Sequence, residues 1–134
     1  MARARAALDA GDACGALTVF LREVVQLSED EFTFVTALPE EWFQAFAGTA
    51  IREMEAASAL DPDPRRYEGL ETETLLLLGT ESAQHLTNAT YGLASALPNA
   101  DIVMLEGQAH NAILIAPDLI ATEIKRFAAG GEPR

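Results

Sequence analysis

Residues 75–110 read LLLLGTESAQHLTNATYGLASALPNADIVMLEGQAH, and this stretch decides the fold. It opens with four leucines closed by Gly79 and Thr80, a short apolar run typical of a strand buried on both faces in a parallel sheet. A second apolar run, at residues 102–105, is closed in the same way by Gly107 and leads to His110. We therefore predict two buried strands, at residues 75–78 and 102–105.

The segments beside these strands have helical spacing. We predict a helix over about residues 83–96, ended by Pro98, and a last helix that begins at Pro117, a residue suited to a first helical turn. A strand, a crossover helix and a second buried strand form a parallel unit that is right-handed in nearly all proteins. Residues 71–134 should therefore form a two-stranded parallel βαβα unit, and the fold class is α/β.

The first half, residues 1–70, is predicted to be helical with frequent interruptions. Asp12 is a candidate N-cap for a helix that runs to about Gln26. Ser28 and Glu31 have the spacing of a capping box, which predicts a second short helix that ends at the next proline.

Two further short helices are expected, separated by a break near Gly48 and closed by the two prolines in residues 61–64. The segment after these prolines is predicted to be a linker. These helices carry the large apolar residues Trp42, Phe43, Phe46 and Met54. Aromatic residues at helical spacing usually serve burial, so core packing is the first interpretation, and lining of a substrate pocket is the alternative.

Composition and charge limit the classes of function. Hydrophobic residues make up 49% and charged residues 22%, which predicts a folded protein. The formal net charge of −12 opposes binding to nucleic acid or anionic lipid. Cys14 is the single cysteine, residues 1–7 lack the apolar core of a signal peptide, and no apolar stretch approaches the ~18–20 residues of a membrane span. We expect a soluble, cytoplasmic protein with no nucleic-acid or membrane partner.

The two strand ends resemble those of a known fold. "LLLLG" and "VMLEGQAH" are similar to the last two strands of the α/β-hydrolase fold, and "GALTVFLREVV", "REM" and "DPDPRRYEGL" are similar to the lid of small bacterial α/β-hydrolases. The resemblance implies a helical lid over residues 1–70, a C-terminal portion of the hydrolase core over residues 71–134, and ester, lactone or similar acyl substrates. With 134 residues against the ~200–250 of many large α/β domains, the chain can be only part of a complete hydrolase.

The same resemblance implies two site residues. His110 stands where the fold places the histidine of its catalytic triad, and the competing interpretation is an incidental loop residue. The acid usually follows the preceding strand's glycine by three positions, where this chain has Ser82. Glu81, one position earlier, is the candidate acid, and its alternative role is that of a solvated loop carboxylate. His85 is expected to be exposed or to contact the start of its helix.

Other components of a catalytic site are missing from the sequence. The 134 residues contain no G-x-S-x-G nucleophile elbow and no HGGG-type stretch for an oxyanion hole. The spacing of His, Cys and acidic residues matches no metal motif, and the phosphate-loop and dinucleotide fingerprints are also missing, so neither a metal nor a cofactor is predicted.

Two hypotheses follow. In the first, the chain is the lid and last two strands of an α/β-hydrolase from a truncated or split reading frame, inactive alone because a base without a nucleophile cannot run acyl transfer. Its partner would be an N-terminal hydrolase half. In the second, the chain is a non-catalytic interaction module that pairs through its sheet edge, as a homodimer or with another chain. An upstream frame encoding G-x-S-x-G would favour the first, and a defined dimer of this chain the second.

Overall fold

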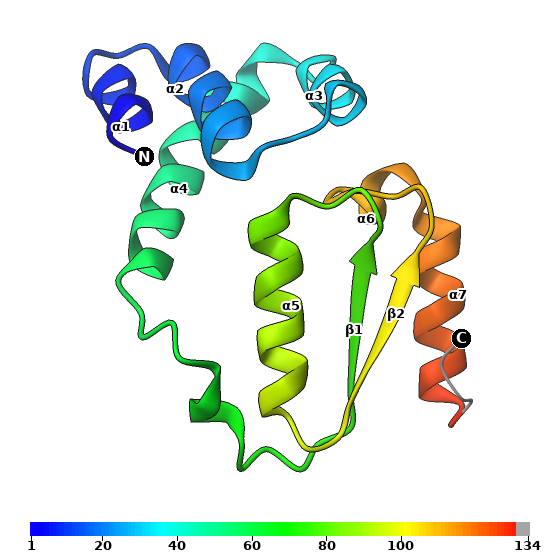
Figure 1. Cartoon of the computed structure of the whole chain (residues 1–134). Helices are drawn as coiled ribbons and strands as arrows, with labels where there is room; N and C mark the ends of the chain where they lie inside the picture. Colours follow the sequence, from blue (N-terminus) through cyan, green and yellow to red (C-terminus); the bar gives the residue numbers. More distant parts are fainter. Residues whose placement is uncertain (131–134) are drawn as a thin grey trace. The chain divides into compact units, whose positions relative to one another are not determined.

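The computed structural model describes residues 1–130 and divides into two compact units, Met1–Pro62 and Asp63–Arg134 (Figure 1). The first unit is helical. It contains α1 (Ala2–Asp9), α2 (Ala13–Val19), the π-helix η1 (Phe20–Val25), α3 (Glu29–Thr36) and α4 (Glu40–Ser58). Its core has Leu17 and Ile51 as the largest fully buried side chains.

Two of the predicted helix starts are confirmed in their atomic detail. The side chain of Asp12 accepts a hydrogen bond from the backbone N–H of Gly15 at the start of α2. The hydroxyl of Ser28 accepts from the N–H of Glu31, and the Glu31 carboxylate accepts from the N–H of Ser28, which is the complete capping box. The helix that begins after Asp12 changes to π geometry at Phe20 and ends before Gln26, whose φ of 60° is left-handed.

The predicted break near Gly48 is wrong, because α4 runs without interruption from Glu40 to Ser58. A glycine inside a helix costs about 1 kcal/mol relative to alanine, and burial of one helix face can outweigh that cost. The buried face consists of Phe43, Ala47, Ala50 and Ile51, which span Gly48. Tertiary packing therefore overrides the local preference for a break.

The large apolar residues of α4 differ in burial according to their position relative to this buried face. Phe43 is buried, and Met54 packs against the core, as expected. Trp42 and Phe46 are 40% and 36% exposed, so their expected burial is wrong. They lie beside the buried face and stack on each other with ring centroids 4.7 Å apart. Helix α1 was not predicted; its Ala4 is fully buried in this core.

The second unit carries the sheet. It contains the 3₁₀-helix η2 (Pro64–Tyr67), β1 (Thr74–Gly79), α5 (Gln84–Ala96), β2 (Ala100–Leu105), α6 (Ala112–Ile115) and α7 (Pro117–Ala128). The segment predicted as a linker thus includes a helical turn, capped by the side chain of Asp63. Pro64 of this turn lies near Gly92 of α5, so η2 packs on the second unit.

Strands β1 and β2 pair in parallel, with Leu76 opposite Ile102 and Leu78 opposite Met104, and α5 forms the crossover (Figure 1). Helices cover both faces. Val103 and Leu105 pack with Leu77 and with Ile120 of α7 on one face. On the other face the hydroxyl of Tyr91 in α5 donates to Sδ of Met104 at 3.9 Å. The expected α/β class and βαβα order are confirmed.

Of the helices in residues 1–130, none has the length and apolar character needed to cross a membrane.

Candidate functional site

The site lies at the carboxyl end of the two strands, where the loop after β1 meets the loop after β2. The backbone N–H of Thr80 donates to the carbonyl of Leu105 at 3.1 Å, and that of Glu81 donates to the carbonyl of Gln108 at 2.9 Å. The hydroxyl of Thr80 accepts a hydrogen bond from the N–H of Gly107 at 2.9 Å. These bonds join the two loops, so the position of His110 is tied to the end of β1.

Gly79 allows this junction. A Cβ at position 79 would lie 2.2 Å from the carbonyl oxygen of Gln108, much closer than real Cβ contacts come. The backbone of the second loop therefore passes directly over Gly79, and only a residue without a side chain permits that approach. The glycine that signals the end of the strand in the sequence also holds the histidine loop against it.

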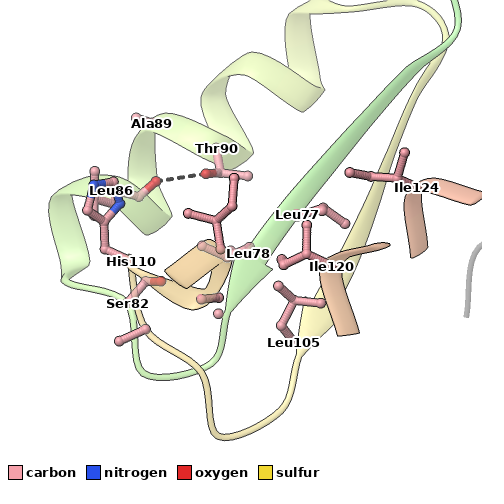
Figure 2. A pocket seen from close by; sticks show the side chains of 14 residues that line it. Leu77, Leu78, Ser82, Leu86, Ala89, Thr90, Leu105, His110, Ile120 and Ile124 are labelled. Carbon is pink, nitrogen blue, oxygen red and sulfur yellow. Dashed lines mark hydrogen bonds between the residues drawn. The ribbon is translucent and has the colours of Figure 1, made fainter. Parts of the chain in front are cut away.

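A pocket of about 470 Å³ opens beside this junction (Figure 2). Its apolar wall comes from β1, β2 and three helices, and His110, Ser82 and Thr90 supply its polar side chains. The Thr90 hydroxyl already donates to the carbonyl of Leu86 at 2.9 Å. A mainly apolar pocket with a few polar groups is the usual form of a small-molecule site.

The sequence candidates are placed differently in this site. His110 lies in the loop between β2 and α6, is exposed, and lines the pocket. Glu81 is exposed in the turn after β1 and lies outside the set of residues that line the pocket, although its backbone is bonded to the histidine loop. His85 is exposed on the first turn of α5. The roles of His110 and Glu81 remain predictions.

Sequence reasoning did not identify the apolar part of the site. Leu86 and Ala89 of α5 and Ile120 and Ile124 of α7 line the pocket, but in the sequence they are ordinary members of helical apolar stripes. Only their helical periodicity was visible, and it predicts a packed face as well as a pocket wall. Among residues 1–130 no group of three His, Cys, Asp or Glu side chains is placed to hold a metal ion.

A solved structure shares this architecture. The crystal structure of an alpha/beta hydrolase from Sphaerobacter thermophilus DSM 20745 superposes with a TM-score of 0.67 and 27% sequence identity over 90% of this chain. The chain has a partial α/β-hydrolase fold. It spans about half of the hydrolase that it matches, 48% of that chain. No family model matches the sequence, and the search of curated proteins finds no match.

The partial hydrolase fold accounts for the position of the site. In open α/β sheets, ligands bind outside the carboxyl ends of the strands, and the junction of the two loops lies at that end. The expected resemblance and fold are therefore confirmed.

Proposed function

We propose that this chain supplies the base of an α/β-hydrolase site for acyl transfer, with His110 as the general base. The serine nucleophile would come from polypeptide other than these 134 residues, which contain no G-x-S-x-G. The observation that carries the proposal is the junction at Gly79, because it holds the His110 loop at the strand ends beside an apolar pocket.

The chemistry assigns one role to each part. The imidazole of His110 takes the proton from the serine hydroxyl as that oxygen attacks the acyl carbon, and returns it to the leaving group. Glu81 is the proposed acid that orients the imidazole, and residues 1–70 are proposed to form the lid. The substrate class is an ester, lactone or similar acyl compound.

The first test uses the chain alone. We expect hydrolysis of a simple aryl ester to be equal for the unmodified chain and for His110→Ala, since the base has no hydroxyl to activate. Turnover that disappears in the His110→Ala variant would show that the chain contains a nucleophile after all.

The second test restores the missing half. The chain is co-expressed with the part of the Sphaerobacter hydrolase that lies outside the match, and ester hydrolysis by the purified complex is measured. We expect activity that falls at least about 10³-fold in His110→Ala while the complex still forms. His85→Ala is the matched control, because His85 is also exposed and is not among the residues that line the pocket. An intact complex that is inactive, or that keeps full activity in His110→Ala, would contradict the assignment.

One observation favours the alternative of a non-catalytic module that pairs through its sheet edge. Within residues 1–130, β1 pairs with β2 alone, which leaves its second edge without a strand. A defined homodimer with no ester hydrolysis in any co-expressed complex would support this alternative.

A further inference from the structure

Met104 is placed differently from the other two methionines of the chain. It lies on β2 and is 43% exposed. Met1 and Met54, in contrast, are partly buried and pack against the core of the first unit. A peroxide must reach the sulfur atom to oxidise a methionine to its sulfoxide. Met104 is therefore the methionine that a peroxide reaches most readily in the folded chain.

A hydrogen-bond donor already points at the sulfur of Met104. The hydroxyl of Tyr91, on α5, donates to Sδ at 3.9 Å, and Tyr91 is itself 50% exposed. A thioether sulfur is a weak acceptor, whereas oxidation makes the side chain polar and adds an oxygen that accepts more strongly. The distance of 3.9 Å leaves room for that oxygen to lie at the ~2.5–3.0 Å of an O–H···O bond from the hydroxyl.

The place of Met104 in the sheet gives this hydrogen bond a structural consequence. Met104 lies opposite Leu78, which is only 3% exposed, at the end of the strand pair. The next residue, Leu105, accepts the N–H of Thr80, one of the bonds that join the two loops of the candidate site. A polar group placed beside apolar side chains costs free energy unless it finds a hydrogen-bond partner. The Tyr91 hydroxyl supplies that partner for a sulfoxide.

We propose that Met104 is a site of reversible oxidation by hydrogen peroxide, and that the Tyr91 hydroxyl holds the sulfoxide oxygen so that the strand pair keeps its structure. A lone pair of Sδ attacks one peroxide oxygen, the S–O bond forms and the O–O bond breaks. The sulfur loses two electrons, and the second oxygen leaves as water after it takes the proton of the first. A methionine sulfoxide reductase reverses the change, because two thiols become a disulfide while the sulfoxide oxygen leaves as water.

Peptide mapping by mass spectrometry, after brief exposure of the whole chain to hydrogen peroxide, tests the site. We expect the sulfoxide to form at least about fivefold faster at Met104 than at Met54, because Met54 packs against the helical core. In the urea-unfolded chain the two rates should be equal. The two epimer-specific methionine sulfoxide reductases, supplied with dithiothreitol, should restore the thioether in the folded chain. Equal rates in the folded chain, or a sulfoxide that the reductases leave in place, would overturn the proposal.

The role of Tyr91 is tested by Tyr91→Phe, which removes only the hydroxyl of an exposed side chain. Urea unfolding, followed by circular dichroism, is measured before and after oxidation of Met104. With Tyr91 present, we expect oxidation to leave the urea midpoint nearly unchanged. In Tyr91→Phe, oxidation should lower the midpoint by about 0.3–1 M, the size expected for one lost hydrogen bond. The same shift with and without the hydroxyl would show that Tyr91 does not hold the sulfoxide.

A second pair of variants tests the same hydrogen bond without peroxide. Met104→Gln places an amide oxygen where the sulfoxide oxygen would lie, and Met104→Leu is the matched control without an acceptor. Adding Tyr91→Phe should lower the urea midpoint of Met104→Gln more than that of Met104→Leu. Equal effects in the two variants would contradict the proposed role of Tyr91. These measurements do not involve ester hydrolysis, so their outcome is independent of the proposed function.

Discussion

Gly79 is the residue on which the candidate site depends most directly. Its missing side chain leaves room for the backbone of Gln108, which belongs to the loop that carries His110. Any larger residue at position 79 must push that loop away from β1, or distort the strand end. Stability and the position of the proposed base are therefore linked through one backbone contact.

We predict that Gly79→Ala lowers the free energy of unfolding by about 1–3 kcal/mol, as overpacking in a well-packed region commonly does. Urea unfolding measures the change. Gly69→Ala is the matched control, because a Cβ at position 69 meets no atom within 4 Å, and its effect should stay within about 0.5 kcal/mol. A neutral Gly79→Ala variant would show that the histidine loop moves freely.

A second residue-scale prediction concerns the ion pair between α1 and α4. Arg5 donates to both carboxylate oxygens of Glu55, from Nε to Oε1 at 3.0 Å and from Nη2 to Oε2. The hydrogen bond from Arg5 lowers the pKa of Glu55 below the ordinary glutamate value, and the positive charge of Arg5 adds to this. We expect Arg5→Ala to raise the pKa of Glu55 to its ordinary range, as measured by NMR titration.

The sign of the pH effect follows from that shift. Since the pKa of Glu55 is lower in the folded state, the pair stabilises the fold at pH values above the unfolded pKa and stops doing so as the pH falls through the folded pKa. The effect is small, because both side chains are partly exposed and water screens them. In Arg5→Ala the difference in stability between neutral and acidic pH should therefore be slightly smaller.

At the scale of elements, α4 shows that tertiary packing can keep a helix continuous at a residue where the local sequence favours a break. Gly48 lies between the buried residues Ala47 and Ala50, and the helix continues through it. A Cβ at position 48 would meet Nη1 of Arg52 at 3.5 Å, an ordinary contact. The glycine is therefore not required by sterics at this position.

We predict that Gly48→Ala raises the free energy of unfolding of the first unit by about 0.5–1 kcal/mol, because alanine loses less backbone entropy in a helix. Trp42 is the only tryptophan and lies in α4, so its fluorescence during urea unfolding follows this unit. No gain, or a loss, would indicate that the chain uses the flexibility of glycine there, as a helix broken at this point would.

The elements that the sequence predicts are those with local causes. Asp12 and Ser28 cap their helices through bonds that span three residues, and the leucine run marks β1 without any knowledge of its partner. Two of the elements that were missed depend on distant contacts: α1 is held through Ala4 in the helical core, and η2 through its packing on α5. The π-helix has no signal in the spacing of its apolar residues.

The candidate site likewise has features that the sequence predicts and features that depend on contacts between distant segments. The place of His110 after β2 follows from strand order and a glycine in the loop, and both can be recognised in the sequence. The crossing of Gln108 over Gly79 and the pocket wall from α5 and α7 arise only when loops and helices far apart in the chain are brought together. No periodicity contains that information.

At the scale of the molecule, exposed apolar surface favours association between copies of the chain, and the net negative charge opposes it. In the second unit, Ile113, Leu114 and Ile124 are 65%, 52% and 51% exposed, and Ile113 and Ile124 line the pocket beside the Gly79 junction. Large exposed apolar patches favour association. The net charge of −12 opposes association between copies, but physiological salt screens charges beyond about 8–10 Å.

We therefore predict that self-association is weak at low ionic strength and strengthens as salt is added, because screening reduces the repulsion while the apolar attraction remains. Sedimentation velocity at low and high salt measures it, and binding of a hydrophobic dye reports the exposed patch. Ile113→Glu should weaken the association at high salt. Leu60→Glu is the matched control, because Leu60 is 63% exposed but belongs to the first unit, so it should have little effect. A compact monomer at both salt concentrations that binds no dye would mean that this apolar surface is covered in solution.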